Sequence, residues 1–109
     1  MLRALEDQFQ SASDSYATHY GIDRDPDWYL LKLMEEAGEV TQVWNKLQNR
    51  GRRRGATDEA LRTDLADELA DLLGMVLLMS RQNGVDLAAA VERKWHFRPA
   101  LPDTASETA

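Results

Sequence analysis

Apolar residues recur at spacings of three and four along most of the chain, which is the period of an α-helix. In the first segment this spacing joins Leu2, Leu5 and Phe9, and it predicts a helix over residues 2–20 that ends at Gly21. No segment alternates convincingly between apolar and polar residues, as a half-buried strand would. The chain is therefore expected to be all-α.

Capping residues predict three further helices. Asp25 and Pro26 form an acidic N-cap followed by proline at the first helical position, a combination that favours helix initiation. Thr57 and Asp86 are expected to cap the next two helices in the same way. The expected ranges end near residues 49, 83 and 95. We predict a four-helix bundle-like subunit.

Length and composition indicate one domain. The chain has 109 residues, of which 43% are hydrophobic, enough for one modest core. We assign residues 1–98 to a single all-α domain. Residues 99–109 are polar and contain two prolines, so they are expected to form a disordered tail.

Charge and hydropathy exclude several classes of protein. The net charge of −6 argues against a nonspecific DNA-binding protein, so no nucleic-acid partner is expected. The longest apolar stretch, Leu72 to Met79, is too short to span a membrane, and the first ten residues lack the apolar run of a secretion signal. There are no cysteines for disulfides or thiolate metal sites. We expect a soluble, cytoplasmic protein.

Two pairs of acidic residues indicate a cation-binding site. Glu36 and Glu39 lie one helical turn apart in KLMEEAGEV, and Glu68 and Asp71 repeat this spacing in LADELADLLG. Helical geometry places each pair at the edge of an apolar stripe, where carboxylates repel one another, lose hydration and call for a cation. Because the loop between the two helices is short, the helices should pack antiparallel, which allows the pairs to converge.

The nature of the cation follows from the ligands. Both histidines lie far from the acidic pairs in sequence, so a hard cation bound by oxygen is favoured over zinc. We expect Mg²⁺, with Mn²⁺ as a substitute. Lys32 lies on the same helix face as Glu36 and could hold a phosphate group. Gly38 costs about 1 kcal/mol of helix propensity relative to alanine, which predicts close approach of another element.

The acidic motifs together resemble a known family. Glu35-Glu36-Ala37-Gly38-Glu39, followed after 28 intervening residues by Glu68-Leu69-Ala70-Asp71, resembles the EExxE…ExxD signature of the MazG-like all-α nucleoside triphosphate pyrophosphohydrolases. The likeness spans about residues 28–95 and includes GVDLAAAVERKW. It implies Mg²⁺-dependent cleavage of a nucleoside triphosphate between the α and β phosphates, giving a nucleoside monophosphate and pyrophosphate. It also implies a homodimer or dimer of dimers, with sites at subunit interfaces.

The resemblance also implies roles for individual residues. Glu35 would orient or deprotonate the attacking water. Lys94 matches a lysine that contacts the triphosphate, whereas Arg98 stands where the family often has asparagine, which changes the phosphate contact expected there. Trp28 is the candidate to stack on the substrate base. The metal-ligand positions are matched by Glu36, Glu39, Glu68 and Asp71.

Several features of the sequence allow more than one interpretation. The stretch LLGMVLLM is apolar all round its helix, which predicts a homodimer or, alternatively, a central helix in a monomer. Trp44 is expected to pack in the core. The arginines at 50–54 could bind phosphate, contact a neighbouring subunit or form a solvated turn. Alternatives to a nucleotide-pool enzyme are a pyrophosphohydrolase for a dedicated metabolite such as phosphoribosyl-ATP, and a non-enzymatic helical interaction module.

Overall fold

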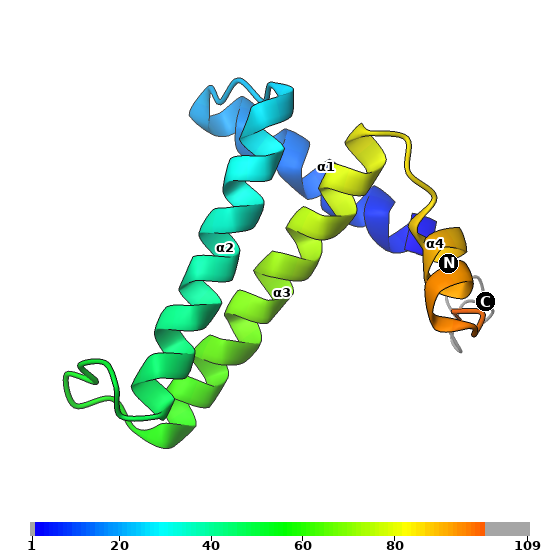
Figure 1. Cartoon of the computed structure of the whole chain (residues 1–109). Helices are drawn as coiled ribbons and strands as arrows, with labels where there is room; N and C mark the ends of the chain where they lie inside the picture. The colour runs from blue at the N-terminus through cyan, green and yellow to red at the C-terminus, as the bar shows by residue number, and fades with distance from the viewer. Residues whose placement is uncertain (1, 100–109) are drawn as a thin grey trace, which may run out of the picture. The chain divides into compact units, whose positions relative to one another are not determined.

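The computed structural model describes residues 2–99, and this part of the chain contains four helices and no strand (Figure 1). The all-α prediction is confirmed. Among the described residues, no helix combines the length and apolarity needed to cross a membrane. The predicted disordered tail lies, from residue 100 onward, outside the described residues. The helices are α1 (Leu2–Tyr20), α2 (Pro26–Leu47), α3 (Asp58–Gln82) and α4 (Leu87–Trp95).

The predicted N-caps are confirmed. The Asp25 side chain accepts a hydrogen bond of 2.8 Å from the backbone N–H of Trp28, and proline follows it in α2. Thr57 and Asp86 likewise accept from the backbone N–H three residues on, both at 3.1 Å. Gly84 follows α3 with a φ of +64°, a left-handed conformation that glycine adopts without steric cost. Local sequence therefore sets these helix boundaries.

The described residues fall into two compact units. One unit is Arg24–Val76, which holds α2 and most of α3; the other contains residues 2–23 and 77–99. In the latter unit an ion pair between Arg81 and Asp7 joins the end of α3 to α1, and Leu77 is buried. The prediction of one domain over residues 1–98 stays a prediction.

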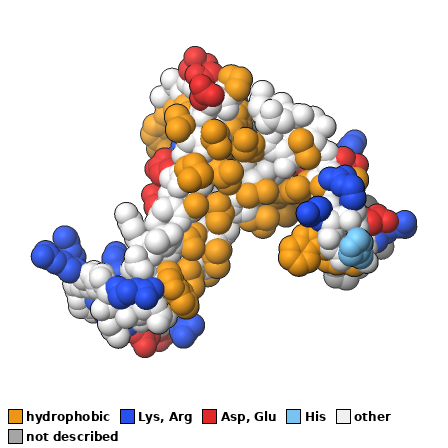
Figure 2. Space-filling model, in the orientation of Figure 1, with side chains coloured by type: hydrophobic (Ala, Val, Ile, Leu, Met, Phe, Trp, Pro, Cys, Tyr) orange, Lys and Arg blue, Asp and Glu red, His pale blue; other side chains and the backbone are white. Residues whose placement is uncertain are grey.

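Within the unit Arg24–Val76, α2 and α3 lie side by side and antiparallel, as predicted (Figure 1). The side chains buried in this hairpin include Tyr29 and Val43 from α2 and Leu61 and Met75 from α3. Hydrophobic side chains also gather on an exposed side of the hairpin, which faces the viewer in Figure 2. The hairpin thus has both buried apolar side chains and exposed ones.

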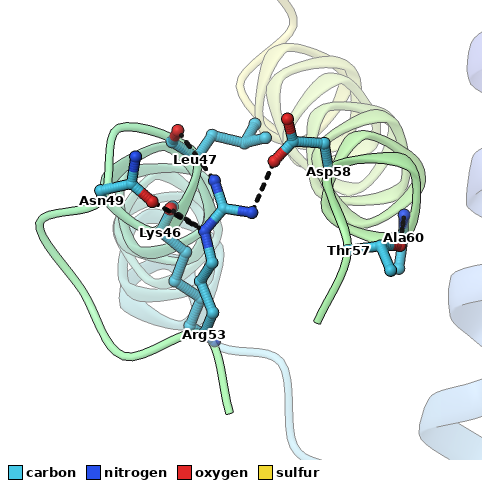
Figure 3. A network of polar contacts seen from close by, with 7 residues as sticks. All are labelled: Lys46, Leu47, Asn49, Arg53, Thr57, Asp58 and Ala60. Carbon is cyan, nitrogen blue, oxygen red and sulfur yellow. Dashed lines mark hydrogen bonds and ion pairs between the residues drawn. The ribbon is translucent and has the colours of Figure 1, made fainter. Parts of the chain in front are cut away.

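Arg53 joins the two ends of the hairpin loop (Figure 3). Its Nε donates to the backbone oxygen of Lys46 at 3.1 Å and to Oδ1 of Asn49 at 2.9 Å, and its Nη2 donates to the backbone oxygen of Leu47 at 3.2 Å. Nη1 pairs with Asp58 in the first turn of α3. A single guanidinium therefore satisfies carbonyls at the end of α2 and links them to the start of α3.

Replacing Arg53 by alanine should lower the free energy of unfolding by about 1–3 kcal/mol, because several acceptors lose a charged donor together. Arg52 is exposed, so Arg52→Ala should have little effect and serves as the matched control. Urea titration followed by circular dichroism measures both variants. Equal stability of the two would show that the Arg53 contacts contribute nothing to the hairpin.

Candidate metal centre

Glu36 is a buried acid in the middle of α2. It is 8% exposed and lies seven residues from both Tyr29 and Val43, on the same buried line. Its Oε2 is inaccessible and has no hydrogen-bond partner among the described residues. The prediction that Glu36 flanks the core stripe is therefore wrong, because the buried line passes through it. Trp44, predicted to pack in the core, is 47% exposed.

Glu68 and Asp71 approach Glu36 from α3. One oxygen of each of the three carboxylates lies within 4.8 Å of the others. Glu68 is half-buried, and its Oε2, like that of Glu36, is inaccessible and has no hydrogen-bond partner within residues 2–99. The predicted convergence of the two acidic motifs is thus found in the hairpin.

Glu36 also belongs to a second group of acids on its own helix. Oxygens of Glu35, Glu36 and Glu39 lie within 4.8 Å of one another. Glu35 is exposed and Glu39 is half-buried, so the cluster of five acids passes from the hairpin core to the surface. A small ligand could reach the outer acids from solvent while the inner ones stay shielded.

Burial and mutual repulsion perturb the inner acids. Burial is the main cause that raises the pKa of Glu36 above its usual 4.5, and the charges of Glu39 and Asp71 add to it, while Lys32 partly opposes them. The pKa of Glu68 is raised to about 7, first by a hydrogen bond with Glu39, then by burial and by the neighbouring charges. Without a cation, the cluster therefore retains a proton close to neutral pH.

The donor set fits a hard divalent cation. Two carboxylate oxygens are buried without a partner in the described part of the chain, a costly arrangement that a bound cation would relieve. All the donors in the two groups are carboxylate oxygens, and the chain has no cysteine. Mg²⁺ and Mn²⁺ prefer such oxygen ligands, whereas zinc usually takes nitrogen or sulfur.

Lys32 and Trp28 lie one and two turns before Glu36. The Lys32 ammonium is 3.0 Å from Glu35 Oε2 and 4.0 Å from Glu36 Oε1, so it accompanies the acids as predicted. Trp28 is half-buried and contacts the ring of Tyr29 edge-on, with ring centroids 5.0 Å apart.

The prediction for Gly38 is wrong. A Cβ atom added there would meet no other described part of the chain within 4 Å. No neighbouring element of the described chain therefore requires glycine at this position.

Lys94 and Arg98 belong to the other unit. Lys94 lies in the last turn of α4 and is exposed, and Arg98 follows α4 with its Nε 3.6 Å from Glu92 Oε2. Their contact with a triphosphate stays a prediction.

The raised pKa of Glu68 predicts how pH affects the metal-free protein. In the folded chain this carboxyl keeps its proton up to about pH 7, whereas its ordinary pKa is 4.5. The folded state binds more protons in this window, so the free energy of unfolding falls as pH rises through it. The melting temperature in chelator should therefore be higher at about pH 5 than at about pH 7.5.

Glu68→Gln is the control for this pH dependence, because it removes the titrating group. Its melting temperature should fall less than that of the unsubstituted chain over the same pH range. Added Mg²⁺ should stabilise the unsubstituted chain more at the higher pH, since carboxylate ligands must be deprotonated to bind metal. If the melting temperatures of both proteins fall equally with pH, the carboxyl of Glu68 is not the group responsible for the pH dependence.

Comparison with protein families connects this geometry to a function. Residues 24–98 match the model of the MazG nucleotide pyrophosphohydrolase domain. This range contains both acidic motifs and all of α2, α3 and α4. No curated protein and no solved structure matches the chain. Because the matched range covers most of the sequence, the chain belongs to the MazG nucleotide pyrophosphohydrolase domain family.

Proposed function

We propose that the protein is a Mg²⁺-dependent nucleoside triphosphate pyrophosphohydrolase. It would cleave between the α and β phosphates and release a nucleoside monophosphate and pyrophosphate, in a nucleotide-pool or housecleaning role. Membership of the family supports the hydrolysis of a nucleotide pyrophosphate bond. The observation that carries the proposed metal dependence is the pair of buried, unpartnered oxygens on Glu36 and Glu68.

Four acids are the proposed metal ligands, with Mn²⁺ able to replace Mg²⁺. An ion held there would neutralise charge on the triphosphate and make water a stronger acid. The acids also need the cation for a second reason: without it, the negative cluster would repel a polyanionic substrate. The ligands are Glu36, Glu39, Glu68 and Asp71.

Glu35 is the proposed base. Its carboxylate is exposed beside the inner acids, which places it where water has access. It would orient the attacking water or take its proton. Lys32, now paired with Glu35 at 3.0 Å, would bind a substrate phosphate as a charged donor. Lys94 and Arg98 are proposed as further phosphate ligands and Trp28 as a stacking surface for the base.

Glu35→Gln should slow turnover by about 10²–10⁴-fold, the usual contribution of a general base, and weaken Mn²⁺ binding much less. Single-turnover kinetics and calorimetric titration with Mn²⁺ separate these two effects. If the variant loses metal affinity as strongly as activity, Glu35 is a ligand rather than the base.

A substrate panel tests the proposed activity. Standard and modified nucleoside triphosphates and phosphoribosyl-ATP are incubated with the protein and Mg²⁺, with chelator as the control, and products are identified by chromatography. We expect pyrophosphate and a monophosphate from at least one nucleoside triphosphate, and none in chelator. Release of orthophosphate and a diphosphate, or no hydrolysis by a folded protein, would overturn the proposal. Hydrolysis of phosphoribosyl-ATP alone would reassign the substrate.

A further inference from the structure

Positive charge is concentrated at one end of the α2–α3 hairpin. Residues 46–62 contain six of the chain's 13 Lys and Arg but only two of its 19 Asp and Glu, so they carry +4 while the rest of the chain carries −10. We call residues 46–62 the basic tip; Figure 2 shows its Lys and Arg side chains at the lower left. The net charge of −6, from which no nucleic-acid partner is expected, therefore averages two regions of opposite sign.

Hydrogen bonds hold the loop of the basic tip in place. The backbone oxygen of Asn45 accepts from the backbone N–H groups of Arg50 and Gly51, at 2.8 and 3.2 Å, and Asn45 Oδ1 accepts from Arg50 Nε at 3.3 Å. The contacts of Arg53 in Figure 3 join the same loop to both helices. The loop therefore presents its other side chains from an ordered backbone, which reduces the entropy lost when a ligand binds.

Three arginines of this loop are exposed, namely Arg50, Arg52 and Arg54. Within the described chain, the guanidinium groups of Arg52 and Arg54 have no hydrogen-bond or ion-pair partner. A guanidinium is always charged and can pair with phosphate oxygens through two parallel hydrogen bonds. The loop therefore offers charged donors to an anionic ligand.

Arg54 stands at a position whose backbone favours glycine. Its φ is +53°, and Gly55 follows with a φ of +82°. An L side chain is strained in this left-handed region, whereas glycine is not. Strain of this kind is typical of residues whose side chains have a function. An arginine at this position thus indicates a use for its guanidinium.

We propose that the basic tip binds the phosphate backbone of a duplex nucleic acid. Arg50, Arg52 and Arg54 would pair with phosphate oxygens, and Lys46 and Arg62 would add positive charge beside them. Binding would not depend on base sequence, because phosphate contacts carry no sequence information directly. The contact is separate from the acidic cluster and does not depend on the proposed hydrolysis.

Charge density and the open loop favour a duplex over other anions. A DNA duplex carries one negative charge per about 1.7 Å of its axis, whereas an extended peptide made only of acids carries one per about 3.3 Å. A small phosphate compound is held best in a concave pocket, whereas these three arginines are exposed on a loop. A long polyanion gains affinity from each exposed guanidinium separately, through the release of its counterions.

The acidic cluster is too distant to oppose this contact strongly. Leu47, the last residue of α2, lies eleven residues after Glu36, which is about 16 Å along the helix axis. At physiological ionic strength the Debye length is about 8 Å, so repulsion from the cluster is largely screened. Within the basic tip, Asp58 is already paired with Arg53.

The salt dependence of binding tests the assignment of individual arginines. Fluorescence anisotropy of a labelled DNA duplex is measured with the full chain at increasing NaCl concentration, and a Kd on the order of 10⁻⁴ M is expected at physiological salt. Arg52→Gln and Arg54→Gln should each weaken binding and reduce the slope of log K against log salt concentration by about 0.9. Arg93→Gln, the same change at an exposed residue of α4, is the matched control and should leave the slope unchanged.

Arg54→Gly separates binding from folding, because it removes the guanidinium and also relieves the backbone strain. It should weaken duplex binding as much as Arg54→Gln does, without lowering the melting temperature. Loss of folding in this variant would show that Arg54 has a structural role instead.

Single-stranded DNA and poly-glutamate of matched length are the comparison ligands, and both should bind more weakly than the duplex. Tighter binding of the single strand would overturn the duplex assignment, and binding of poly-glutamate as tight as that of the duplex would reassign the basic tip to an acidic protein partner. Absence of duplex binding at low salt would also overturn the proposal. So would equal salt slopes in the unsubstituted chain, Arg52→Gln and Arg54→Gln.

Discussion

Replacing Glu39 by glutamine, or Asp71 by asparagine, is expected to reduce turnover of the triphosphate by about a thousandfold or more. A catalytic metal contributes several kcal/mol of transition-state stabilisation, and each 1.36 kcal/mol corresponds to about a tenfold change in rate. Both acids lie at the outer part of the cluster, half-buried or exposed, so neither substitution should disturb the hairpin core. Helix content and oligomeric state should therefore remain unchanged.

Asp67→Asn is the matched control for Asp71→Asn. Asp67 is an exposed acid one turn earlier on α3, and it belongs to neither group of clustered carboxylates. Its substitution should leave turnover within a few-fold of the original value. Full activity in both Glu39→Gln and Asp71→Asn would show that these acids are not metal ligands.

Replacing Glu36 by methionine should raise the stability of the metal-free protein while abolishing activity. Methionine has a similar length and fills the same buried position, and it removes a carboxylate oxygen that finds no partner in the described chain. Relief of such a group corresponds to about 1–3 kcal/mol. The melting temperature in chelator should therefore rise, and the further rise on adding Mg²⁺ should disappear.

Glu35→Met is the control for stability in this experiment. It changes the same residue type at the preceding position, but the Glu35 side chain is 52% exposed and lies outside the buried line. Its melting temperature in chelator should change little. If Glu36→Met strongly destabilises the metal-free chain, or keeps its stabilisation by Mg²⁺, the buried carboxylate is not held in place for a cation.

The helices and the meeting of the acids could be predicted because their causes are local. Asp25, Thr57 and Asp86 cap their helices through contacts three residues away, which sequence shows directly. A short loop forces α2 and α3 to pack antiparallel. The i, i+3 spacing places both acids of each motif on one face of their helix, so the two motifs can meet. The family signature was confirmed over residues 24–98.

The depth of Glu36 could not be predicted because the apolar surface of α2 is wider than its buried part. Tyr29, Glu36 and Val43 are buried, whereas Trp44 is 47% exposed. The centre of the apolar stripe therefore does not coincide with the buried line through Glu36. Helical periodicity gives the width of an apolar surface, but not its division between the chain's own core and the outside.

The role of Arg53 and the surroundings of Gly38 depend on tertiary contacts, which the sequence alone does not show. Nothing in the run of arginines at 50–54 distinguishes Arg53, whose role follows from the carbonyls and the Asp58 carboxylate that its guanidinium reaches. The helix-propensity cost of Gly38 predicts close contact with another element, whereas the described chain leaves space around it.

Crystals grown with Mn²⁺ test the central claim most directly, because anomalous scattering locates the ion independently of any assay. The expected result is an anomalous peak among Glu36, Glu39, Glu68 and Asp71, which is lost in crystals of Glu36→Met. A peak elsewhere, or no peak at these acids in a protein that hydrolyses triphosphate under the same conditions, would contradict the proposed metal centre.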